Sequence, residues 1–268
     1  MCATCGCGDD TTTITVAGHA HPHSHDHDHP HTRTETITLE QKVLAKNDLI
    51  AEQNRQWLAE RAILALNMTS SPGAGKTTLL ERTIRELEGD RPVAVIEGDQ
   101  ETLLDAERIQ AAGARAVQVN TGAGCHLDAD MVHRALHALD PEPESLLFIE
   151  NVGNLVCPAL FDLGAHSKVV VISVTEGQDK PLKYPHMFAA AGLVLINKID
   201  LVPYVSFNIE ACLGFARSVN PGVEILPVSA TTGDGLDAWY DWIRTKIGIS
   251  GKLRLMSLRP VDKTLPRE

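Results

Sequence analysis

The chain has 268 residues, of which 43% are hydrophobic, and its formal net charge at neutral pH is −11. A chain of this length can bury a sizeable core and suits one α/β domain with appendages. The acidic balance argues against a general nucleic-acid-binding protein, whose surface is normally basic. No stretch approaches about 18 uninterrupted apolar residues and no apolar leader opens the chain, so we expect no membrane span, no secretory signal and a cytoplasmic location.

Residues 1–36 are poor in aliphatic side chains, so we expect a flexible tail that cannot offset the entropy cost of ordering. Thiols and imidazoles, which suit Zn, Cu and Ni better than Mg or Ca, dominate this tail. An expression tag or a solvated linker is the alternative, but the histidines alternate with other residues and follow a cysteine cluster, which favours metal binding. The residues concerned are Cys2, Cys5, Cys7, His19, His21, His23, His25, His27, His29 and His31.

Residues 37–60 are predicted to form an N-terminal helix. Thr38 and Gln41 fit a capping box at its start, and the apolar residues that follow lie mostly along one helical stripe. We expect this helix to pack on the flank of the domain or on a partner.

Strand and helix patterns alternate through residues 61–250, which predicts one α/β domain with a mainly parallel sheet and helices on both faces. The basic, proline-containing stretch 251–268 is expected to be a loose C-terminal tail. The expected strands are 62–68, 92–97, 115–119, 145–150, 168–174, 193–197 and 223–227, and the expected helices are 76–88, 101–112, 128–139, 181–191, 206–218 and 235–247.

A glycine-rich turn at 70–78 follows the first expected strand and opens the first helix of the domain, which is the context of a P-loop. Its backbone N–H groups, from Gly73, Ala74, Gly75, Lys76, Thr77 and Thr78, are expected to surround phosphate oxygens at a helix N-terminus. Lys76 would reach the β- and γ-phosphates and Thr77 would ligate Mg²⁺. Ser70 stands where the general pattern has its first glycine. The fold is therefore predicted to be that of a P-loop NTPase.

The segment Asn197-Lys198-Ile199-Asp200 follows another apolar run and matches the guanine-recognition motif of P-loop GTPases. The carboxylate of Asp200 can accept from the ring N–H and the amine of guanine together, whereas adenine offers no such donor pair. Ser229 and Ala230 resemble the further motif whose backbone N–H meets the guanine carbonyl. We therefore expect GTP and GDP rather than ATP.

Two acidic segments end expected strands on the same edge as the P-loop. Asp99 lies in Glu97-Gly98-Asp99-Gln100, and Glu150 opens Glu150-Asn151-Val152-Gly153, which resembles a GTPase switch with Glu in place of Asp. Such carboxylates can hold Mg²⁺ and order the attacking water. Lys76, Asp99 and Glu150 are the catalytic candidates, and the sequence leaves open which acid performs which task.

Three further metal-ligand candidates fall in the loops after the strands. Cys125 and His126 are adjacent, and Cys157 follows Glu150 by seven residues. One protomer then leaves a tetrahedral Zn²⁺-like site incomplete, and two protomers could share it across a symmetry axis. Cys212, inside an apolar helical pattern, is interpreted as a small core residue.

Together these segments resemble the HypB family of hydrogenase nickel-incorporation GTPases, relatives of the urease-accessory GTPases. The matching pieces are the Cys2, Cys5 and Cys7 cluster, the His tract, Ser-Ser-Pro-Gly-Ala-Gly-Lys-Thr-Thr, Glu-Gly-Asp-Gln, Thr-Gly-Ala-Gly-Cys-His, Glu-Asn-Val-Gly-Asn-Leu-Val-Cys-Pro and Asn-Lys-Ile-Asp. The likeness covers essentially the whole chain, and Ser70 fits this family.

The resemblance implies GTP hydrolysis coupled to delivery of Ni²⁺ to the large subunit of [NiFe] hydrogenase. It implies a HypA-type zinc-containing partner and a homodimer that GTP favours. Cys2, Cys5 and Cys7 would form a tight nickel site, and the His tract would store nickel. Cys125, His126 and Cys157 would form a Zn²⁺ or Ni²⁺ site at the dimer interface.

Two other functions stay open at this stage. The chain could be a nickel storage or sequestration protein in which the nucleotide only regulates, or a maturation GTPase for another nickel enzyme such as urease. An intact P-loop together with a guanine motif favours the nickel-delivery function, because a passive store needs neither.

Overall fold

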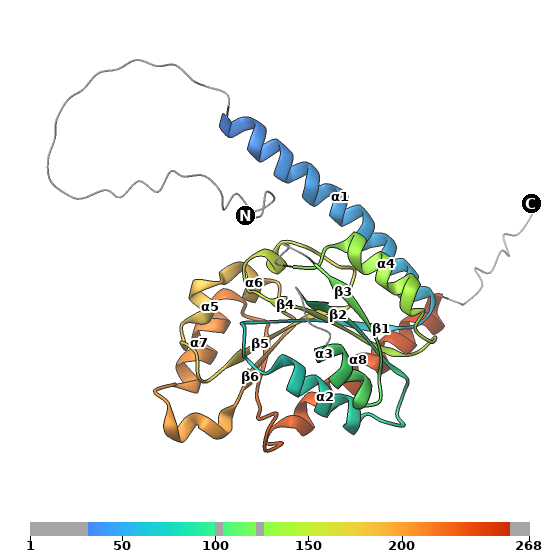
Figure 1. Cartoon of the computed structure of the whole chain (residues 1–268). Coiled ribbons are helices and arrows are strands. Elements are labelled where there is room, and N and C mark those ends of the chain that lie inside the picture. Colours follow the sequence, from blue (N-terminus) through green and yellow to red (C-terminus); the bar gives the residue numbers. More distant parts are fainter. Residues whose placement is uncertain (1–31, 100–103, 122–125, 258–268) are drawn as a thin grey trace, which may run out of the picture.

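A computed structural model of the chain describes residues 32–99, 104–121 and 126–257, and the side-chain surroundings within 41–98, 105–121 and 126–248. The described strands form one seven-stranded sheet in the order β3-β2-β4-β1-β5-β6-β7, and every pair of neighbours is parallel (Figure 1). Helices lie on both faces, so the predicted fold class is confirmed. None of the described helices is long and apolar enough to cross a membrane.

The strands fall within a few residues of their predicted positions. They are β1 (Leu64–Ser70), β2 (Val93–Asp99), β3 (Arg115–Asn120), β4 (Leu146–Gly153), β5 (Ser167–Ser173), β6 (Leu193–Asn197) and β7 (Glu224–Pro227). β4 extends beyond its predicted end at 150, so Glu150 lies within the strand and not at its end.

The helices follow the predicted order, with two short 3₁₀ turns, η1 and η2, added. They are α1 (Thr32–Glu60), α2 (Lys76–Glu86), α3 (Leu104–Ala111), α4 (Ala129–Leu139), η1 (Cys157–Ala159), α5 (Lys180–Lys183), α6 (Pro185–Ala189), η2 (Ile199–Tyr204), α7 (Ile209–Val219) and α8 (Leu236–Ser257).

Two predicted helix ends and one predicted continuous helix are wrong. α1 begins at Thr32, inside the stretch expected to be a flexible tail, and α8 runs to Ser257, into the stretch expected to be a loose C-terminal tail. The single helix predicted over 181–191 is two short helices that meet at Tyr184. Pro185 causes this break, because the ring of a proline excludes the helical conformation from the residue before it.

Apolar side chains alternate along the central strands and so build a core on each face of the sheet. One face packs against α2, α3 and α8. On the other face, α1 and α4 cover one half, and α5, α6 and α7 cover the other half (Figure 1). Because β1 is the middle strand, the loop after it opens at the centre of the sheet edge.

Two buried asparagines fix α1 to the domain, which agrees with the packing role expected for this helix. Asn54 Nδ2 donates to the carbonyl oxygens of Ala129 at 2.9 Å and Leu163 at 3.2 Å. Asn47 accepts from the backbone N–H of Ala129 at 2.9 Å and donates to the carbonyl oxygen of Asp162 at 2.8 Å. α1 therefore holds the start of α4 and the segment before β5 together.

Candidate functional site

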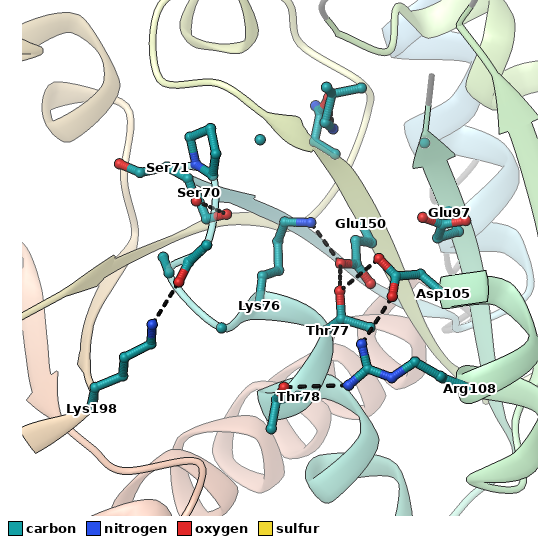
Figure 2. A pocket seen from close by; sticks show the side chains of 18 residues that line it. Ser70, Ser71, Lys76, Thr77, Thr78, Glu97, Asp105, Arg108, Glu150 and Lys198 are labelled. Atoms are coloured by element: carbon teal, nitrogen blue, oxygen red, sulfur yellow. Dashed lines mark hydrogen bonds and ion pairs between the residues drawn. The ribbon is translucent and has the colours of Figure 1, made fainter. Parts of the chain in front are cut away.

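A cavity of about 660 Å³ lies at the carboxyl end of β1, where the sheet order predicts a ligand site. Its walls come from residues 70–78 between β1 and α2, the ends of β2 and β4, the first turns of α3, and Lys198 after β6. Lys76, Thr77, Asp105 and Glu150 point toward one another in this cavity (Figure 2). The structure therefore brings the predicted P-loop and the predicted Glu150 segment to one site.

The glycine-rich turn has the backbone that a phosphate loop needs. Gly73 and Gly75 have φ angles of +71° and +91°, a left-handed region that L side chains rarely adopt. A Cβ on Gly75 would also lie 2.6 Å from the side-chain nitrogen of Asn197. Gly75 is the N-cap of α2, so the first N–H groups of that helix open toward the cavity.

Lys76 and Thr77 meet the buried carboxylate of Glu150 on the cavity floor. Lys76 Nζ lies 2.6 Å from Glu150 Oε1, and Thr77 Oγ1 donates to the same oxygen at 2.7 Å (Figure 2). The other oxygen, Glu150 Oε2, is buried and has no hydrogen-bond partner among the described residues. A buried charged oxygen without a partner is costly, and a bound cation would satisfy it. These residues therefore fit the predicted Mg²⁺ site.

Asp105, at the start of α3, adds a carboxylate that the sequence analysis missed. Its Oδ2 lies 3.3 Å from Thr77 Oγ1, and its Oδ1 pairs with Arg108 Nη1 at 2.9 Å. Arg108 is also held by Glu81 at 2.9 Å, which fixes the orientation of its guanidinium group. No motif marks Asp105, because it is one acid among several on an ordinary amphipathic helix.

The Asn-Lys-Ile-Asp segment is bonded directly to the P-loop. Asn197 Nδ2 donates to the carbonyl oxygen of Ala74 at 2.8 Å, and Lys198 Nζ donates to that of Gly73 at 2.7 Å. Asn197 is 1% exposed and also accepts from the backbone N–H of Ala230 at 3.0 Å. Side-chain hydrogen bonds therefore hold together the P-loop and the Asn197–Asp200 segment, which lie far apart in the chain.

Asp200, in the segment after β6, and Ser229, in the loop after β7, lie side by side. Ser229 Oγ donates to Asp200 Oδ1 at 2.5 Å, and the backbone N–H of Thr232 donates to Ser229 Oγ at 3.0 Å. The second carboxylate oxygen of Asp200 is not used by this bond. The structure thus groups all the predicted guanine-contacting residues in one region, while contact with a base stays a prediction.

Comparison with known proteins assigns the family. Residues 64–227 match the model of the CobW/HypB/UreG nucleotide-binding domain. The hydrogenase maturation factor HypB of Escherichia coli strain K12 is 58% identical over 210 residues, which cover 78% of this chain and 72% of that protein. The chain belongs to the HypB family.

Solved HypB structures share this fold. The crystal structure of the hydrogenase maturation factor HypB from Archaeoglobus fulgidus has a TM-score of 0.70 at 40% identity, covering 76% of this chain and 99% of that one. HypB from Helicobacter pylori, crystallised in complex with nickel, has a TM-score of 0.71 at 37% identity, covering 75% of this chain and 95% of that one. The resemblance to the HypB family drawn from the motifs is therefore confirmed.

Two of the three metal-ligand candidates in the HypB-type domain are described. His126 is 9% exposed with its ring centroid 4.2 Å from that of Phe161, and Cys157 is 7% exposed at the start of η1. Burial lowers the pKa of His126, against the opposing charge of Asp128, and so favours the neutral imidazole that binds metals. Within the described residues, no group of three or more His, Cys, Asp or Glu side chains could hold a metal ion.

The remaining predicted ligands lie outside the described part of the chain, so their roles stay predictions. They are Cys2, Cys5, Cys7, Cys125, the His tract from His19 to His31, and the side chain of Asp99. Cys212 is buried in the apolar core, as predicted, and burial raises the pKa of its thiol to about 11.

Proposed function

We propose that the protein hydrolyses GTP and uses nucleotide binding to help deliver Ni²⁺ to the large subunit of [NiFe] hydrogenase. One observation carries the proposal. A P-loop, whose Lys76 and Thr77 meet Glu150 in the cavity, is hydrogen-bonded to a segment that matches the guanine-recognition motif. The names of the relatives, which are hydrogenase maturation factors, and the nickel complex of one of them support the same direction.

In the proposed reaction the P-loop backbone and Lys76 bind the phosphates. Thr77 and Glu150, with Asp105 beside them, would hold Mg²⁺. Bound there, Mg²⁺ neutralises the charge that develops on the phosphate oxygens. Glu150 Oε1 is engaged with Lys76 and Thr77, and Oε2 has no partner among the described residues, so the proposed role of Glu150 is to hold the cation and order water. We assign the same role to Asp99.

The base would be selected beyond the P-loop. Asp200 presents a carboxylate to the two adjacent donors of guanine, and Lys198, whose ammonium group is fixed on Gly73, would lay its stem along the ring. Asn197 supports this arrangement from below without facing solvent. Discrimination against adenine follows from the carboxylate of Asp200, because adenine lacks the pair of adjacent donors that guanine offers it.

The cargo metal would bind at Cys125, His126 and Cys157, as Ni²⁺ or Zn²⁺, and at Cys2, Cys5 and Cys7. A tetrahedral site needs a fourth ligand, which a GTP-favoured homodimer would supply from its partner or from solvent. The proposed partners are a HypA-type accessory protein and the hydrogenase large-subunit precursor.

A single substitution tests the hydrolytic part of this proposal. Lys76→Ala removes the phosphate-binding ammonium group and leaves the buried Glu150 without its cationic partner, so we expect GTP hydrolysis to fall by at least about 10²-fold. Arg85→Ala, in the last turn of the same helix, is the matched control. Phosphate release measured on the full chain decides, and a wild-type rate in Lys76→Ala would exclude this active site.

A further inference from the structure

Leu127 connects the nucleotide cavity with the loop that carries His126. It follows His126 directly in the chain and is 0% exposed. Its backbone N–H donates to Asn151 Oδ1 at 3.1 Å. Its side chain packs so closely on Gly98 that a Cβ there would lie 2.8 Å from Leu127 Cγ. Asn151 and Gly98 both line the cavity, so two of its walls contact the same residue.

Asn151 has hydrogen-bonding capacity that the protein does not use. It is 1% exposed and follows Glu150, whose carboxylate meets Lys76 and Thr77. Its Oδ1 accepts from the backbone N–H groups of Leu127 and Val152, the latter at 3.0 Å. Its Nδ2 is buried and has no partner among the described residues. An unpaired buried donor costs free energy, and an oxygen of the nucleotide or of its bound water would satisfy it.

We propose that Asn151 is a positioning residue that transmits the state of the nucleotide to the His126 loop through its hydrogen bond to Leu127. This inference rests on the proposed function. The acceptor that Nδ2 gains depends on the nucleotide. It sets the orientation of the amide plane, and this orientation determines whether Oδ1 keeps its hydrogen bond from the backbone N–H of Leu127. A displacement of Leu127 moves His126, because the two residues are adjacent in the chain and Leu127 is packed against Gly98. Because coupling between sites is reciprocal, a metal bound at His126 alters nucleotide affinity by the same factor.

Asn54 is a matched control for this role. It is 0% exposed and, like Asn151, bonds to the backbone at the start of α4, donating to the carbonyl oxygen of Ala129 at 2.9 Å. It lies on α1 and does not line the cavity. Asn54→Ala and Asn151→Ala therefore both remove a buried amide from this region. Only Asn151→Ala removes the hydrogen bond between Leu127 and a side chain that lines the cavity.

The first experiment measures Ni²⁺ affinity of the full chain loaded with GDP or with a non-hydrolysable GTP analogue. In the wild type and in Asn54→Ala we expect the two affinities to differ by at least about fivefold. In Asn151→Ala we expect their ratio to approach one, although nucleotide still binds. Equal affinities in the wild type, or a ratio that survives in Asn151→Ala, would overturn the proposal.

The second experiment needs no metal and separates this inference from the proposed function. Amide hydrogen exchange at Leu127 is expected to differ between the two nucleotides in the wild type, and to become faster and nucleotide-independent in Asn151→Ala. Gly98→Ala, which pushes on Leu127 from the other wall, should also raise this exchange rate. Nucleotide that binds without changing Leu127 exchange would overturn the link alone, while failure to bind GTP would remove both.

Discussion

Asp105 brings a carboxylate to the nucleotide cavity from a helix that carries no recognisable motif. It touches Thr77, while Arg108 and Glu81 hold it in place through a chain of ion pairs. A ligand held by such a network is pre-organised, so less ordering is needed when a cation binds.

Replacing this carboxylate tests its role in cation binding. Asp105→Asn keeps the shape of the side chain and removes its charge, so we expect the Mg²⁺ concentration needed for half-maximal GTP hydrolysis to rise about 10-fold or more. Glu107→Gln, an exposed acid on the same helix, serves as the control. An unchanged Mg²⁺ dependence in Asp105→Asn would show that this residue is not part of the cation site.

Asp200 allows a second test at the scale of a single side chain. Asp200→Asn replaces one acceptor oxygen by a donor, so we expect the preference for GTP over ATP to fall about 10- to 100-fold, mainly through weaker GTP binding. Asp234→Asn removes an exposed acid nearby and should leave the preference intact. Competition binding with both nucleotides measures the effect, and an unchanged preference would contradict guanine recognition by Asp200.

Site residues that belong to a contiguous motif could be predicted from sequence, and isolated ones could not. The P-loop and the Asn197–Asp200 segment have fixed spacings, because one turn of backbone must fit one chemical group. Asp105 contacts Thr77 only in the fold, and neither spacing nor composition marks it. Asn151 lies in the switch-like segment after Glu150, but its hydrogen bond with Leu127 could not be predicted from that segment.

At the scale of elements, Lys168 at the start of β5 supports the turn η1, which begins at Cys157. Its Nζ donates to the carbonyl oxygens of Pro158 at 2.7 Å and Ala159 at 3.3 Å. Burial is the main cause that lowers the pKa of this amine from 10.5 to about 8, while the charge of Asp162 opposes the shift. The folded protein therefore bears the cost of a poorly solvated ammonium group at neutral pH.

This shift predicts a pH dependence of stability. Between about pH 8 and 10.4 the unfolded chain binds more protons at Lys168 than the folded protein does, so the free energy of unfolding rises with pH in that window. We expect the wild type to gain stability relative to Lys168→Met between pH 7.5 and 9.5. Urea unfolding measures this difference. Lys46→Met, an exposed lysine on α1, should show no comparable trend, and a flat difference for Lys168→Met would exclude the lowered pKa.

Strands could be placed from sequence more reliably than helix ends. The buried runs of β1, β5 and β6 are bounded by turn residues, and their predicted ranges agree with the structure within two residues. The break at Tyr184 had a signal in Pro185 that the helical pattern of neighbouring residues concealed. The start of α1 carries no proline or glycine signal at its predicted boundary, so local sequence could not define it. At the end of α8 the signal misled, because the helix runs through Gly248 and Gly251.

At the scale of the molecule, the proposed roles of tail and domain can be separated by truncation. The described contacts of α1 begin at Asn47, so removal of residues 1–31 should leave the domain and its GTP hydrolysis intact. We expect hydrolysis within about twofold of the full chain, with partial loss of hydrogenase maturation in cells. Complete loss of maturation with normal hydrolysis would instead favour a storage protein in which the nucleotide only regulates.

The order of strands across the sheet could not be predicted from local patterns. Helix and strand alternation indicates a parallel sheet, but it does not say that β1 lies between β4 and β5. That order depends on which apolar faces pack best once all helices are present, a property of the whole chain.

The central position of β1 also has a consequence for how the protein is made. Lys76 meets Glu150 across 74 residues of chain, and Ala74 meets Asn197 across 123. As the chain leaves the ribosome from its N-terminus, the phosphate loop emerges long before the residues that complete it. A newly made chain can therefore bind its nucleotide only after β6 has emerged. The two neighbours of β1, β4 and β5, emerge before β6, so the centre of the sheet can pair before the nucleotide site is complete. Until β4 has emerged, β1 has neither neighbouring strand and its apolar surface stays uncovered.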